Sequence, residues 1–168
     1  GDSDDKATDA TTTVAGADTT VPAVDTKLTP TKFTFGTTAC PPAEGATKPT
    51  LTFDAPPKNC LEDGKTYTAT FDTTAGKIVV ELDTKATPGT ANNFVFLARY
   101  HYFDGIIFHR IIDGFVIQGG DPEGTGMGGP GYEFEDELPR QGSYEKYSVA
   151  MANAGPDTNG SQFFFVYA

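Results

Sequence analysis

The sequence contains no tryptophan, two cysteines and two histidines, and its 12 basic and 23 acidic residues give a net charge of -11. This charge would repel nucleic acid and anionic membrane surfaces, so we expect neither as a partner. No apolar run approaches the roughly 20 residues that a membrane-spanning helix needs. Two cysteines cannot supply the four ligands of a structural zinc site, and neither His101 nor His109 lies near them in the sequence.

The two cysteines, Cys40 and Cys60, lie in a proline-rich stretch that contains the pairs Pro41-Pro42 and Pro56-Pro57. A disulfide between them would close a loop and stabilise the fold by about 3 kcal/mol. The alternative is a free, reactive thiol. We favour the disulfide because an exposed segment gains little from buried cysteines, and a disulfide indicates an oxidising environment.

The start of the chain lacks a methionine, and no signal peptide is recognisable. Its small, acidic opening Gly1-Asp2-Ser3 resembles the segment that follows the lipid-modified cysteine of bacterial lipoproteins. A plain secreted protein or an arbitrary boundary is the alternative. We expect an extracytoplasmic protein, secreted or in the cell envelope, whose only membrane attachment would be an N-terminal lipid anchor.

Three regions differ in composition. Residues 1–32 are rich in Thr, Asp and Ala and have few large apolar side chains, which predicts a disordered tether. Residues 33–66 alternate short apolar pieces with prolines, which predicts an extended arm. Residues 67–168 are rich in Phe, Tyr, Ile and Val and can bury a core.

A β-hairpin followed by a helix is predicted early in the third region. Residues 67–72 and 77–82 are alternating or β-branched, and a turn at 73–76 separates them. Thr87-Pro88 has the composition of a helix start, with Thr as the cap and Pro in the first turn. Helical spacing predicts a core-facing set: Ala91, Phe94, Val95, Ala98 and Tyr102.

Further strands are predicted at residues 106–109, 115–118, 147–151 and 162–167. A series of strands with one early helix indicates a mainly β protein, built as an antiparallel β-barrel with a flanking helix. The Gly-rich sequence at 124–129 fits G-x-G-x-x-G, but Pro130-Gly131 follows it instead of a helix, so we interpret it as a surface loop. The acidic residues at 133–137 lack calcium-loop spacing and are interpreted as a solvated face.

Two longer runs suggest a function. Residues 108–121 read FHRIIDGFVIQGGD, and residues 151–164 read MANAGPDTNGSQFF. Together they resemble the cyclophilin family of peptidyl-prolyl cis/trans isomerases almost residue for residue, and the resemblance covers about 67–168. The family pattern continues beyond the equivalent of Ala168 with further strands, a second helix, and pocket residues that include a Trp, a Leu and a His. The resemblance therefore implies an incomplete barrel, whose open edge would favour self-association.

The resemblance implies a catalytic Arg110 that donates to the prolyl nitrogen, with Gln118 orienting it and His109 at the rim. Phe115, Val116 and Phe164 would form the proline slot, where Val116 replaces a frequent methionine. Ala152, Asn153, Ala154 and Gln162 would line the neighbouring groove, with the backbone of Asn153 binding the peptide.

Such a site needs no cofactor or metal. Its partners would be proline-containing segments of folding proteins, and cyclosporin-like cyclic peptides would also bind. The alternatives are a module that binds proline-containing peptides without catalysis and a self-assembling structural module.

Overall fold

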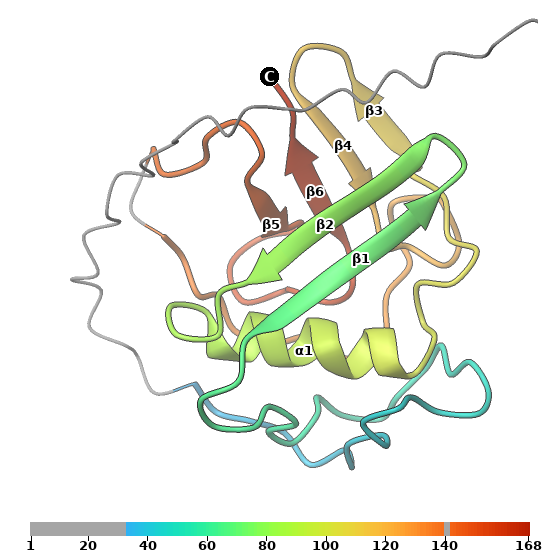
Figure 1. The fold of residues 1–168 in the computed structure, drawn as a ribbon, viewed down its shortest axis with the longest axis vertical. Helices are drawn as coiled ribbons and strands as arrows, with labels where there is room; N and C mark the ends of the chain where they lie inside the picture. The colour runs from blue at the N-terminus through green and yellow to red at the C-terminus, as the bar shows by residue number, and fades with distance from the viewer. Residues whose placement is uncertain (1–32, 140–141) are drawn as a thin grey trace, which may run out of the picture.

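The structure, a computed structural model, describes residues 33–139 and 142–168. Within these residues it contains two antiparallel sheets and one α-helix (Figure 1). This confirms a mainly β fold with a flanking helix, although the described strands do not close into a barrel. The predicted tether at 1–32, including the lipoprotein-like opening, lies outside the described residues. In the described part of the chain, no helix has the length and apolar character needed to cross a bilayer.

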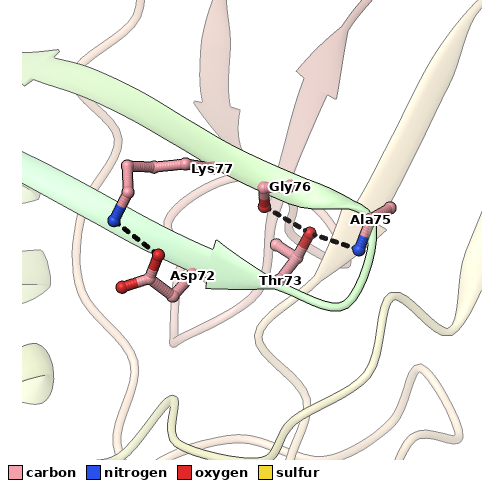
Figure 2. A network of polar contacts seen from close by, with 5 residues as sticks. All are labelled: Asp72, Thr73, Ala75, Gly76 and Lys77. Atoms are coloured by element: carbon pink, nitrogen blue, oxygen red, sulfur yellow. Dashed lines mark hydrogen bonds and ion pairs between the residues drawn. The ribbon is translucent and has the colours of Figure 1, made fainter. Parts of the chain in front are cut away.

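The predicted hairpin is confirmed. Strand β1 (Tyr67–Thr73) pairs with β2 (Gly76–Leu82) from Tyr67↔Leu82 to Thr73↔Gly76. At the turn, the Thr73 hydroxyl accepts a hydrogen bond from the Ala75 N–H and donates one to the Gly76 carbonyl (Figure 2). Gly76 has φ +131°, a value that favours glycine.

The second sheet has the order β3-β4-β6-β5. Its strands are β3 (Arg110–Ile112), β4 (Val116–Gly119), β5 (Val149–Met151) and β6 (Phe163–Val166). Phe163 and Phe165 of β6 are buried, and apolar side chains of the β1–β2 hairpin and the helix pack against them. The β1–β2 hairpin therefore covers one face of this sheet and does not cover the other.

One predicted strand is wrong. Residues 106–109 have no regular structure, and the strand begins only at Arg110. Phe108 still contributes to the core, with its ring 6.4 Å from that of Phe163 and 6.0 Å from that of Phe165. Ile106 and Phe108 therefore pack against the core without strand pairing, whereas Ile107 between them is 63% exposed.

Helix α1 (Pro88–Arg99) begins after Thr87, as predicted, with proline in the first turn. However, the Thr87 side chain does not cap it and instead donates to the carbonyl of Asp83 at 2.9 Å. The Glu137 carboxylate accepts the N–H groups of Gly89 (2.9 Å) and Thr90 (2.7 Å). A distant acidic side chain therefore satisfies the first turn and opposes the positive end of the helix dipole.

The helix is buried on more than one face. Four of the predicted core residues are buried, but Ala98 is exposed, whereas Phe96 and Leu97 are completely buried. The reason is the segment at 33–66, which runs along α1 on the side away from the second sheet (Figure 1). Because both sides are covered, a single apolar stripe does not describe this helix.

The segment at 33–66, here called the arm, is attached to α1 by packing and hydrogen bonds. The Phe53 ring lies 4.8 Å from Phe96. Asn92 accepts the Cys60 N–H at 2.6 Å and donates to the Lys58 carbonyl at 2.9 Å. The predicted disulfide between Cys40 and Cys60 is present and closes the arm on itself.

Candidate active site

The strand register places three predicted site residues in one row. Arg110 on β3 lies opposite Gln118 on β4, Gln118 lies opposite Phe164 on β6, and Phe164 lies opposite Ala150 on β5. Residues directly opposite each other point to the same side of a sheet, and neighbours along a strand point to opposite sides. The row therefore occupies the face opposite the one that Phe163 and Phe165 bury against the hairpin.

Arg110 presents a positive charge on this face. Its side chain is exposed, and Nη1 donates to Gln118 Oε1 at 3.2 Å. It forms no ion pair within the described residues. Because a guanidinium has five N–H donors, others remain available for a ligand.

The predicted apolar slot is only partly open. Phe115 is 52% exposed and follows a turn at Gly114, which has φ +66°. Phe164 is half-buried. Val116, by contrast, is 2% exposed and pairs with Val166, so it offers almost no surface to a ligand in this structure.

His109 is half-buried, and its ring nitrogens do not reach the open surface in this structure. Both of its ring nitrogens are buried, and neither has a hydrogen-bond partner among the described residues. A side-chain carbon built on Gly126 would lie 3.7 Å from His109 Nε2, so the ring packs beside the glycine-rich loop. His109 is thus next to Arg110 in the chain, but its ring lies against the loop.

A groove adjoins Gln118 and contains the remaining predicted residues. Its cavity has a volume of about 740 Å³, and its walls include Gln118, Gln162, Ala152, Asn153 and Ala154. The Asn153 side chain donates to Asp136 at 3.0 Å and to Asn159 at 3.2 Å. No described residue hydrogen-bonds to the main-chain N–H or C=O of Asn153, which leaves both available to a ligand.

Sequence reasoning missed Asp121, the residue that shapes the glycine-rich loop at 122–129. Asp121 is 1% exposed. Its carboxylate accepts the N–H groups of Glu123 (2.8 Å), Thr125 (2.9 Å) and Gly126 (2.6 Å), and also the Thr125 hydroxyl (3.3 Å). Burial raises the pKa of Asp121, but the loop N–H groups stabilise the charged form more strongly, so the pKa lies below its usual value of 3.8.

Two buried tyrosines fix the segment behind the groove. Tyr132 donates to Asn93, whose Nδ2 donates to the Gly160 carbonyl at 2.8 Å. The Tyr102 hydroxyl lies 2.9 Å from the Ser161 hydroxyl. Burial raises the pKa of Tyr132, and it raises that of Tyr102 to about 12. Both therefore stay protonated near neutral pH and act as hydrogen-bonding supports.

Comparison with known proteins gives a consistent family. The profile described as "Cyclophilin type peptidyl-prolyl cis-trans isomerase/CLD" matches residues 68–168. Peptidyl-prolyl cis-trans isomerase A of Mycobacterium tuberculosis is 50% identical over 115 residues, which cover 59% of this chain and 63% of the relative. Peptidyl-prolyl cis-trans isomerase-like 1 of Mus musculus is 54% identical over 102 residues, which cover 58% of this chain and 61% of the relative.

Solved structures agree with this likeness. A crystal structure of a Cryptosporidium parvum cyclophilin-type peptidyl-prolyl cis-trans isomerase matches with a TM-score of 0.58 and 39% identity, covering 62% of this chain and 68% of that one. A second structure of that enzyme, in the presence of the dipeptide Ala-Pro, matches with a TM-score of 0.56 and 41% identity, covering 59% and 66%. The chain thus spans somewhat less than two thirds of the length of the curated relatives described above.

Proposed function

Because this chain belongs to the cyclophilin-type peptidyl-prolyl cis-trans isomerase family, we propose that it accelerates cis–trans rotation of X-Pro peptide bonds. The observation that carries the proposal is the exposed Arg110 guanidinium, which Gln118 holds on the same sheet face as Phe164. This arrangement combines a permanent hydrogen-bond donor with an aromatic surface. Those two features are what a twisted prolyl amide requires.

The chemistry of the reaction explains the role proposed for Arg110. Rotation about the amide bond has a barrier of about 18–20 kcal/mol because it breaks resonance. The twisted bond leaves a lone pair on the prolyl nitrogen, and an Arg110 N–H donates to it. A hydrogen bond from a charged group contributes about 1.5–3 kcal/mol. Orientation of the peptide in a desolvated site supplies the remaining reduction of the barrier.

The proposed substrate is an extended, proline-containing peptide segment. Phe115 and Phe164 would contact the proline ring, and the main-chain N–H and C=O of Asn153 would bind the backbone in the groove beside Gln118. The related Cryptosporidium parvum enzyme was crystallised in the presence of the dipeptide Ala-Pro, which supports this substrate class. Folding proteins with exposed X-Pro bonds are then the natural clients.

The test is a protease-free isomerisation assay on an X-Pro peptide. We expect Arg110→Ala to lower kcat/KM by about 10- to 150-fold, the equivalent of one charge-assisted hydrogen bond. Lys77→Ala is the matched control, because Lys77 is an exposed cation on β2 that pairs with Asp72 at the hairpin turn (Figure 2). Equal activity in wild type and Arg110→Ala would remove Arg110 from the mechanism.

A second candidate function is self-association at the β5 edge of the second sheet, where the sheet adjoins strand β2. An open cavity of about 1050 Å³ lies between β2 and β5, and its lining includes Val79 (62% exposed) and Tyr147 (81% exposed). Strand β5 also forms one edge of its sheet, and an unpaired edge can bind another strand. Light scattering over a range of protein concentrations tests this, and a constant monomer mass would contradict it.

The proposed setting of the protein is extracytoplasmic. The disulfide between Cys40 and Cys60 supports this location, because disulfides persist in oxidising compartments. Cell fractionation combined with thiol labelling tests the location. A fully reduced protein in the cytoplasmic fraction would contradict it.

A further inference from the structure

A directional series of hydrogen bonds leads from Arg110 to the glycine-rich loop. Arg110 Nη1 donates to Gln118 Oε1 at 3.2 Å, and Gln118 Nε2 donates to Gln162 Oε1 at 2.9 Å. Gln162 Nε2 then donates to the carbonyl of Gly126 at 3.0 Å and to that of Gly128 at 2.9 Å. Both glutamine amides thus act as donor on the loop side and as acceptor on the Arg110 side.

The loop fixes the direction of this series. A carbonyl oxygen can only accept a hydrogen bond, so the group of Gln162 that faces Gly126 and Gly128 must be its NH₂. Gln162 therefore turns its oxygen toward Gln118, so Gln118 must donate to it from its own NH₂. This leaves the Gln118 oxygen for Arg110. Reversing either amide would place two oxygens or two NH₂ groups against each other.

The two loop carbonyls are in turn held by Asp121. The buried carboxylate accepts the N–H groups of Thr125 and Gly126 on one oxygen and that of Glu123 on the other. Gly126 has φ +85°, and any side chain at Gly128 would collide with Asp121 Oδ1. The carbonyls are therefore rigidly placed at the far end of the series from the exposed guanidinium.

We propose that Gln162 is a positioning residue that transmits the geometry of the Asp121-held loop through Gln118 to the Arg110 guanidinium. The proposal rests on the proposed isomerase function and deepens it. Gln162 also lines the groove, so its ordinary role would be to contact the peptide. A positioning role affects the reacting bond, whereas a lining role affects peptide affinity.

Two variants distinguish these roles. Gln162→Leu removes both the donor and the acceptor. Gln162→Glu keeps the size but turns a carboxylate toward two carbonyls. For both we expect kcat to fall about tenfold while KM stays within about twofold, because the donor to the prolyl nitrogen loses its orientation. The activity of Gln162→Glu, compared with that of wild type at each pH, should recover as the pH falls from about 8 to about 4, since the usual pKa of a glutamate is about 4.3 and a protonated carboxyl again donates.

A spectroscopic measurement tests the series without activity. The Arg110 side-chain N–H resonances in an NMR spectrum report the order of the guanidinium. We expect them to broaden or shift in Gln162→Leu and Gln162→Glu. Glu133→Gln changes a different, exposed wall of the groove and should leave these resonances unchanged.

The outcomes distinguish a failure of the proposed isomerase function from a failure of the positioning role of Gln162. Wild-type protein without isomerase activity would overturn the proposed function, while the Arg110 resonances would still test the positioning of Arg110. Unchanged Arg110 resonances in both Gln162 variants, or a raised KM with an unchanged kcat, would overturn the positioning role. If Gln162→Leu does not fold, the same readouts on the size-matched Gln162→Glu decide the question.

Discussion

Replacing the buried Asp121 carboxylate with an amide of the same size tests how the glycine-rich loop is held. One oxygen of Asp121 accepts the Glu123 N–H, and the other accepts the N–H groups of Thr125 and Gly126. Asp121→Asn substitutes an NH₂ group for one of these oxygens, and a donor cannot bond to a donor. The less costly orientation keeps the oxygen toward Thr125 and Gly126 and turns the NH₂ toward Glu123.

The magnitude follows from this orientation. A buried N–H group left without an acceptor costs about 1–3 kcal/mol, and the remaining bonds lose their charge assistance. We therefore expect Asp121→Asn to lower the free energy of unfolding by about 2–4 kcal/mol at neutral pH. The exposed Asp104, paired with His101 at the surface, provides a control, and Asp104→Asn should change this free energy by less than about 0.5 kcal/mol.

The same substitution should also change the pH dependence of stability. The pKa of Asp121 in the folded protein is below its usual value of 3.8, so the unfolded chain takes up a proton first as the pH falls. The stabilisation by this carboxylate is fully present above pH 3.8 and disappears as the pH falls through the lower, folded pKa. Asp121→Asn lacks this titration, so the stability gap between wild type and variant should narrow in that acidic range.

Urea unfolding followed by circular dichroism measures the gap, since the chain has no tryptophan to report on folding. Wild type, Asp121→Asn and Asp104→Asn are compared at neutral pH and at several values below pH 3.8. If the difference in unfolding free energy between wild type and Asp121→Asn stays constant over this range, the loop N–H groups do not stabilise the ionised form of Asp121. A gap below about 0.5 kcal/mol at neutral pH would refute the role assigned to its hydrogen bonds.

Two further predictions concern the arm and the helix. Replacing both Cys40 and Cys60 with serine should lower the free energy of unfolding by about 3 kcal/mol, because the disulfide closes a loop with a sequence separation of 20; a loss below about 1 kcal/mol in urea unfolding would contradict this. Glu137→Gln should cost about 1 kcal/mol, because it removes the charge opposite the helix dipole, whereas Glu81→Gln on exposed β2 should cost much less in the same measurement.

The features that could be predicted from the sequence are those that local chemistry decides. The β1–β2 hairpin follows from two alternating segments around a turn, and the start of α1 follows from Thr87-Pro88. The pairing of Cys40 with Cys60 follows from there being two cysteines in a proline-rich segment. Each of these depends on residues within a short stretch of chain.

The features that were missed depend on distant parts of the chain. Phe96 and Leu97 are buried because the arm covers a second face of α1, and helical periodicity carries no information about such a cover. The cap of α1 comes from Glu137, 48 residues beyond Gly89. Residues 106–109 form no strand because the pairing of β3 with β4 includes only Arg110 to Ile112.

In the candidate site too, some features follow from the local sequence and others depend on distant parts of the chain. The alternation of side chains along a strand places Gln118 on a defined face, but only the register shows that Arg110 and Phe164 share that face. The sequence around Asp121 does contain a local indication of its role. An aspartate ahead of a glycine-rich turn commonly accepts N–H groups from the residues that follow it. The functional roles of these residues remain predictions that the experiments above test.

The arm changes how helix α1 should tolerate substitution. A helix on the surface of a protein accepts polar residues along its outer face, so the effect of mutation rises and falls with every turn. Here residues 91–97 are all buried, and exposure returns at Ala98. Scanning mutagenesis of α1 should therefore find almost uniform sensitivity from Ala91 to Leu97, as in an interior helix, and that sensitivity should become periodic again when the arm is detached.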